Sequence, residues 1–152
     1  MNNHGSPRSF KVSNDGIGCA GDKGAVAVEF ALVLPIFLIL VLGIFEFGRA
    51  LNIQVSLSEA ARESTRYVAV HHGDAGFSVG AAQSAGVAAA PSVPLKTSDV
   101  TISYSSGSAC ATGVNVISTV RYSAGFMTGL EKLIGVSQPF TIAGKGVMRC
   151  GG

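Results

Sequence analysis

The chain has 152 residues and a formal net charge of +2, and only 13% of its residues are charged whereas 47% are hydrophobic. This balance is too apolar for an ordinary soluble domain of that size and indicates contact with lipid. The net charge is small and the sequence has no run of Lys or Arg residues. The chain therefore lacks the basic surface typical of a nucleic-acid-binding protein.

The first 24 residues are polar and glycine-rich and show no periodic apolar pattern. We interpret residues 1–24 as a disordered, removable leader. In an ordinary secretory signal the cleavage site follows the apolar region. Here the small and charged residues Asp22, Lys23 and Gly24 come before the apolar region, so the order is inverted.

Residues 25–45 form an apolar segment in which Glu29 is the one charged residue. The segment approaches the ~20 residues that cross the core of a bilayer. A buried helix of a soluble domain is the alternative, but few cores of so small a chain accommodate such a run. We therefore predict a membrane-spanning helix, in which Pro35 produces a kink that membrane helices tolerate.

The helix is expected to continue outside the bilayer as an amphipathic extension over residues 46–72, because this stretch contains no proline and ends in the turn-forming sequence 71–76. Glu46 and Arg49, at i and i+3, are expected to mark the exit into water and to form a local ion pair. The extension also carries a predicted apolar stripe that packs against the rest of the chain. This stripe consists of Phe47, Leu51 and Val55, broadened by Ala50, Ala61 and Val68.

Residues 73–152 are predicted to form a small extracytoplasmic domain. A short helix is expected within 76–90, followed by three segments of alternating apolar residues at 99–105, 113–123 and 138–150. In the last segment the alternation places Phe140, Ile142 and Met148 on one face. The expected fold is α+β: a long N-terminal membrane-spanning helix continues outside the bilayer, and a small antiparallel sheet of three to four strands packs on its C-terminal half.

The start of the apolar segment carries a specific pattern. It reads GAVAVEFALVLP over residues 24–35, followed by GIFEFGR over 43–49 and by AAR over 60–62. This pattern resembles TadE-like minor pseudopilins of tight-adherence (Flp-type) pilus systems. The resemblance is strong from residue 24 to about residue 70 and only general beyond. It implies a non-enzymatic structural subunit of the bacterial inner membrane, with its N-terminus in the cytoplasm and its C-terminal domain in the periplasm.

The resemblance also implies how the chain is processed and what it contacts. In such proteins a prepilin peptidase cuts on the cytoplasmic side, after a glycine and before the apolar helix. The cut here would fall between Gly24 and Ala25, which makes Glu29 the fifth residue of the mature chain. The implied partners are the inner membrane, the prepilin peptidase, other pilins or pseudopilins and the pilus assembly platform. No nucleic acid, small-molecule substrate or cofactor is expected.

Glu29 is the most informative residue in this pattern. An ionised acid within an apolar span costs about 2.5–3.5 kcal/mol on insertion scales, so it needs a partner. The resemblance implies that the new N-terminal amine of a neighbouring subunit pairs with Glu29 during assembly. The alternative is an interfacial glutamate at the helix end that faces headgroups and water.

Three cysteines are present, Cys19, Cys110 and Cys150. If Cys19 leaves with the leader, the mature chain carries an even number in an oxidising compartment. Cys110 precedes the segment 113–123 and Cys150 ends the last one, so antiparallel pairing of these strands would bring the two together. We predict a disulfide between them. Two unpaired, buried thiols are the alternative.

No catalytic, cofactor or metal site is predicted. His71, His72 and Asp74 are interpreted as a solvated helix end, because no second cluster supplies further metal ligands. The sequence Gly144-Lys145-Gly146 lacks the longer pattern of a phosphate-binding loop. Two other functions stay open: an uncleaved, single-pass anchored periplasmic adaptor, and, with less support, a tethered extracytoplasmic enzyme.

Overall fold

The computed structural model describes residues 20–129, 132, 135 and 139–151. Residues 1–19 of the expected leader, with Cys19, lie outside the described residues. In chain order the elements are α1 (Ala20–His71), α2 (Val79–Ala88), the short 3-10 helix η1 (Thr97–Asp99), β1 (Val100–Tyr104), β2 (Asn115–Ala124) and β3 (Phe140–Arg149). The chain forms two compact units, residues up to 38 and residues 39–152.

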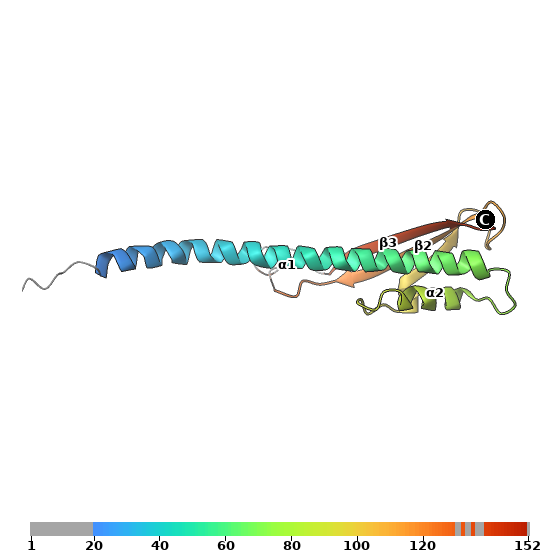
Figure 1. The fold of residues 1–152 in the computed structure, drawn as a ribbon, viewed down its shortest axis with the longest axis horizontal. Helices are drawn as coiled ribbons and strands as arrows, with labels where there is room; N and C mark the ends of the chain where they lie inside the picture. The colour runs from blue at the N-terminus through green and yellow to red at the C-terminus, as the bar shows by residue number, and fades with distance from the viewer. Residues whose placement is uncertain (1–19, 130–131, 133–134, 136–138, 152) are drawn as a thin grey trace, which may run out of the picture. The chain divides into compact units, whose positions relative to one another are not determined.

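The three strands form one antiparallel sheet in the order β1-β2-β3. Val120 lies in the centre, opposite Val100 on β1 and Gly144 on β3. Alternation in β2 is regular, since Val116, Ser118 and Val120 are buried while the residues between them are partly exposed. Figure 1 shows that the strands and α2 both lie beside the C-terminal half of α1. The expected α+β fold with a three-stranded antiparallel sheet is confirmed.

The face of α1 that packs against the sheet differs from the predicted stripe. Phe47, Leu51 and Val55 are 67%, 47% and 62% exposed, so this part of the prediction was wrong. The buried positions of α1 outside the proposed span are Glu46, Ile53, Leu57, Ala60, Ala61, Ser64, Thr65 and Val68. Ala61 and Val68 belong to both sets, but the packing face is centred on small side chains rather than on the larger apolar ones.

Close packing of α1 against β3 depends on two glycines. A Cβ atom at Gly144 would lie 2.6 Å from the backbone nitrogen of Ser58, and one at Gly146 would lie 2.6 Å from the carbonyl carbon of Ala61. Neither distance is possible without movement of the backbone. Alternation places both glycines on the buried face of β3, where they let the strand touch the helix backbone directly. Met148 follows on the same alternation, as predicted, but is 37% exposed.

A similar approach joins α1 to α2. A Cβ atom at Gly86 would lie 2.9 Å from the carbonyl oxygen of Ala60 and closer still to the hydroxyl of Ser64. The helix α2 begins at an N-cap serine, because the Ser78 Oγ accepts a hydrogen bond from the amide of Ala81 at 3.1 Å. The core between α1, α2 and the sheet thus consists mainly of Ala, Val, Gly and Ser side chains.

Candidate membrane-anchoring and assembly segment

The apolar part of α1 is exposed along its length. Its large side chains from Val26 to Phe45 are 36–69% exposed, a pattern opposite to that of a soluble core helix. Among the described residues, α1 is the one helix long and apolar enough to cross a membrane. Pro35 lies inside this continuous helix. The segment therefore has the surface that a lipid-embedded helix requires.

The residues expected to direct processing and assembly lie near the start of α1. Gly24, Ala25 and Glu29 are all helical and exposed. Because α1 begins at Ala20, residues 20–24 of the expected leader are helical, and the expectation of disorder was wrong for them. Helical hydrogen bonding extends readily from an existing helix into adjacent residues. Glu29 has no side-chain partner among the described residues, so its carboxylate is available for intermolecular pairing.

The sequence suggested that Glu46 faces water. In the structure this residue is buried, with an exposed fraction of 6%. Its Oε1 atom accepts hydrogen bonds from the amides of Met127 and Thr128, at 2.7 and 2.9 Å. Its Oε2 atom lies 3.5 Å from the Nε of Arg49, which confirms the expected local ion pair. Arg49 in turn donates to the carbonyl oxygen of Gly125. Two charged side chains of α1 thus hold the loop 125–129 against the helix.

These contacts also set the protonation of Glu46. Burial of the carboxyl by itself raises its pKa, but the amide hydrogen bonds from Thr128 and Met127 act in the opposite direction. The nearby charge of Arg49 lowers it further, so the net pKa lies below the ordinary value of 4.5. Glu46 is therefore an anion at neutral pH, and the loop amides are bonded to a charged acceptor.

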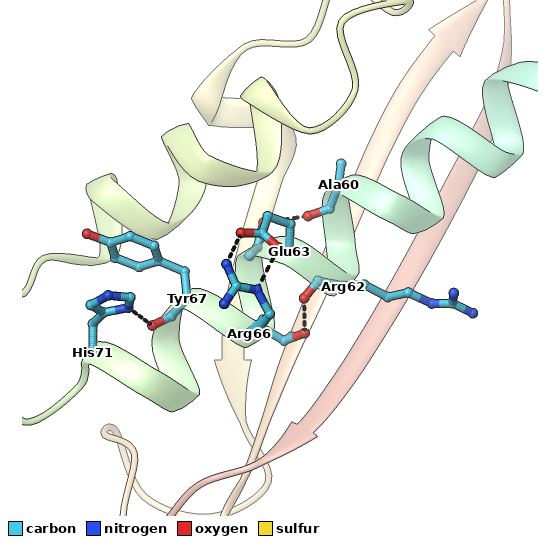
Figure 2. A network of polar contacts seen from close by, with 8 residues as sticks. Ala60, Arg62, Glu63, Arg66, Tyr67 and His71 are labelled. Carbon is cyan, nitrogen blue, oxygen red and sulfur yellow. Dashed lines mark hydrogen bonds and ion pairs between the residues drawn. The ribbon is translucent and has the colours of Figure 1, made fainter.

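Further along α1, acidic and basic side chains pair at i and i+3. Arg66 donates from Nε and Nη2 to the two carboxylate oxygens of Glu63, at 2.8 and 2.6 Å, as Figure 2 shows. Arg62 extends away from this pair and lies 3.7 Å from Glu59. These pairs lie on the solvent side of the helix, where screening by water makes their contribution to stability small.

The C-terminal end of α1 carries the two histidines. His71 stacks on Tyr67 with ring centroids 4.3 Å apart, and its Nδ1 lies 3.0 Å from the carbonyl oxygen of Tyr67 (Figure 2). His72 Nδ1 lies 3.0 Å from the carbonyl oxygen of Ala69. Within the described part of the chain, no three His, Cys, Asp or Glu residues gather as metal ligands would. These local contacts at the end of α1 explain the positions of both imidazole rings.

Cys110 and Cys150 form a disulfide, with Cα atoms 5.5 Å apart. The bond joins the loop before β2 to the residue directly after β3. Cys150 is fully buried, and its amide donates to the carbonyl oxygen of Val114 at 2.8 Å. This end of the sheet is therefore tied both covalently and by a backbone hydrogen bond.

Two structural features of this region were not found from the sequence. The bonding of Glu46 to the loop 125–129 has no local signal, because its partners are backbone amides 81 and 82 residues away. The roles of Gly144 and Gly146 did have a signal, since glycines two residues apart within a strand mark a face where another backbone approaches closely.

Comparison with known families supports the resemblance seen in the sequence. Residues 24–66 match the family model described as TadE-like protein. This range includes Gly24, Glu29, the exposed apolar segment and most of the buried face of α1. The family is one of structural, pilus-associated proteins. Neither a curated protein nor a solved structure matches the chain.

Proposed function

We propose, from the premise that residues 24–66 are TadE-like, that this chain is a minor pseudopilin-like structural subunit that acts in assembly of a tight-adherence pilus. Residues 25–45 anchor it in the inner membrane, and residues 46–152 lie in the periplasm. The observation that carries the proposal is an exposed apolar helix with one acid, Glu29, at the start of the family match. Such a helix is built for lateral association in lipid rather than for catalysis.

The proposed mechanism begins with cleavage after Gly24 by a prepilin peptidase. The cut creates a cationic amine on Ala25, near the lipid boundary. When a neighbouring subunit brings this amine to Glu29, each charge removes the cost of leaving the other unpaired in a low-dielectric setting. The pair then favours one register between neighbouring helices, because an apolar surface alone is equally satisfied by many registers.

The experiment compares Glu29→Val with the wild type in cells that produce the pilus. Glu29→Val is expected to be cleaved and inserted normally, but to lose crosslinking to pilin-like partners and to lose pilus production. Glu59→Val is the matched control, because Glu59 lies on the same helix outside the apolar segment and is exposed. Full complementation by Glu29→Val would contradict the assembly role. An N-terminal sequence that starts at Met1 instead of Ala25 would favour the uncleaved anchored adaptor.

A further inference from the structure

The loop 125–129 presents an apolar surface next to the end of the proposed span. Met127 is 72% exposed, the highest exposure among the large hydrophobic side chains described. Phe126, directly before it, packs against Phe140 with the two rings tilted and their centroids 5.3 Å apart. The loop backbone is fixed to α1 through Glu46 and Arg49. Met127 is therefore held in an exposed position by contacts on both sides.

An apolar groove lies between this loop and α1. It has a volume of about 320 Å³ and is lined by Gly43, Glu46, Phe47, Ala50, Phe126 and Phe140. Glu46 is the one charged residue of the lining, and its carboxylate is already bonded to the loop amides and to Arg49. The groove therefore presents hydrocarbon and aromatic surface.

The position of this surface along α1 indicates what covers it. Gly43 belongs to the proposed span, and Ile44, Phe45 and Phe47 continue its exposed apolar surface up to the groove without interruption. Because a bilayer core takes about 20 helical residues, anchoring of residues 25–45 would place residues 46–50 at the depth of the headgroups. It would place the loop that is hydrogen-bonded to Glu46 and Arg49 at the same depth.

The polar contacts of the loop suit a position at the boundary between the headgroups and the hydrocarbon core. A backbone N–H facing hydrocarbon without an acceptor costs several kcal/mol, and here the amides of Met127 and Thr128 both donate to Glu46. An unpaired carboxylate would be equally costly, and Arg49 compensates its charge. The acceptor for the loop amides and the counter-ion of that acceptor are thus both supplied by α1.

We propose that the loop 125–129 and the adjoining groove form a membrane-contact surface, with Met127 in the interface of the bilayer and lipid acyl chains in the groove. This inference rests on the proposed anchoring of residues 25–45. It adds a second contact with lipid, made by the loop 125–129 beside the end of the span.

The test uses the fact that the chain contains no tryptophan. Single-tryptophan variants of the full chain are placed in phosphatidylcholine vesicles, with and without bromine on the acyl chains. Met127→Trp and Phe47→Trp probe the proposed surface, and Phe37→Trp probes the span. Val147→Trp is the control, because Val147 is 55% exposed toward the other end of β3. Bromine quenches tryptophan only at close range, so quenching reports contact with lipid.

We expect blue-shifted emission and bromolipid quenching for Met127→Trp and Phe47→Trp, at least half as strong as for Phe37→Trp, and no quenching for Val147→Trp. Water-like emission at positions 127 and 47 with a quenched Phe37→Trp would overturn the inference and leave the anchor intact. Blue-shifted but unquenched emission would overturn it in favour of a protein partner, such as a second copy. An unquenched Phe37→Trp would overturn the anchoring itself.

Discussion

Gly146 and Ala61 are so close that α1 and β3 touch through backbone atoms. A Cβ on the glycine would lie 2.6 Å from the carbonyl carbon of Ala61 and 2.9 Å from the amide nitrogen of Arg62. The neighbouring atoms all belong to the backbone of α1, so no flexible side chain can move aside. The distance between sheet and helix is therefore set by the lack of a side chain at this position.

We expect Gly146→Ala to destabilise the domain, because the added methyl group forces the strand away from the helix and loosens contacts around Leu57 and Val120. Overpacking of this kind typically costs about 1–3 kcal/mol. The measurement is urea unfolding of the detergent-solubilised chain. Gly80→Ala is the matched control, since the nearest atom to its Cβ would be 3.9 Å away. Equal unfolding midpoints for the two variants would contradict the close packing.

The disulfide is expected to be a major source of stability for so small a core. It spans a sequence separation of 40 residues, for which the chain-entropy model gives about 4 kcal/mol. Cys110→Ser combined with Cys150→Ser should therefore lower the free energy of unfolding by up to that amount. In the uncleaved chain, Cys19→Ser is the control and should leave stability unchanged. Thiol labelling that finds both Cys110 and Cys150 free in the non-reduced protein would rule out the bond.

Glu46→Gln is expected to weaken the attachment of the loop 125–129, because the amide side chain offers no charge to Arg49 and a weaker acceptor to Met127 and Thr128. Losing a charged hydrogen-bond acceptor typically costs about 1.5–3 kcal/mol. The readout is hydrogen-exchange protection of the Met127 and Thr128 amides. Glu59→Gln, which alters an exposed pair on the same helix, should leave this protection unchanged.

The attachment of the loop 125–129 to α1 should also weaken as the pH falls. The folded pKa of Glu46 lies below its ordinary value of 4.5, so the bound state favours the ionised carboxylate. Its contribution is fully present above that value and is lost as the pH falls through the lower, folded pKa. Protection of the loop amides, corrected for intrinsic exchange, should hold above pH 4.5 and fall below it. In Glu46→Gln this fall should be absent.

Processing is tested at Gly24 itself. We expect Gly24→Leu to block cleavage, because a small residue lets the backbone enter a peptidase site beside the bilayer. The variant should retain residues 1–24 and migrate more slowly than the mature wild type. Gly21→Leu, also within the leader, is the control and should be cleaved normally. A Gly24→Leu protein of wild-type mass would place the cut elsewhere.

Elements of the fold were predicted correctly where the sequence signal lies in neighbouring residues. Alternation in β1 and β2 and the prolines after α2 specify their elements through neighbouring residues, and these elements were predicted. The packing face of α1 was not, because periodicity identifies an apolar side without showing which of two sides the sheet covers. Large residues such as Phe47 suggested one side, whereas the glycines of β3 select the side where the helix backbone at Leu57 and Ala61 meets the strand.

Because α1 contributes both the exposed apolar segment and part of the core, proteolysis can release the folded part of the chain only at certain positions. Leu57 and Val68 have no exposed surface and pack with residues of the sheet and α2. A protease that cuts within 57–68 therefore severs the core and leaves no folded fragment to release. A cut that liberates an intact fragment must fall before Ile53, and near Glu46 and Arg49 the loop 125–129 covers the helix. Shedding is thereby confined to a few exposed residues around Leu51.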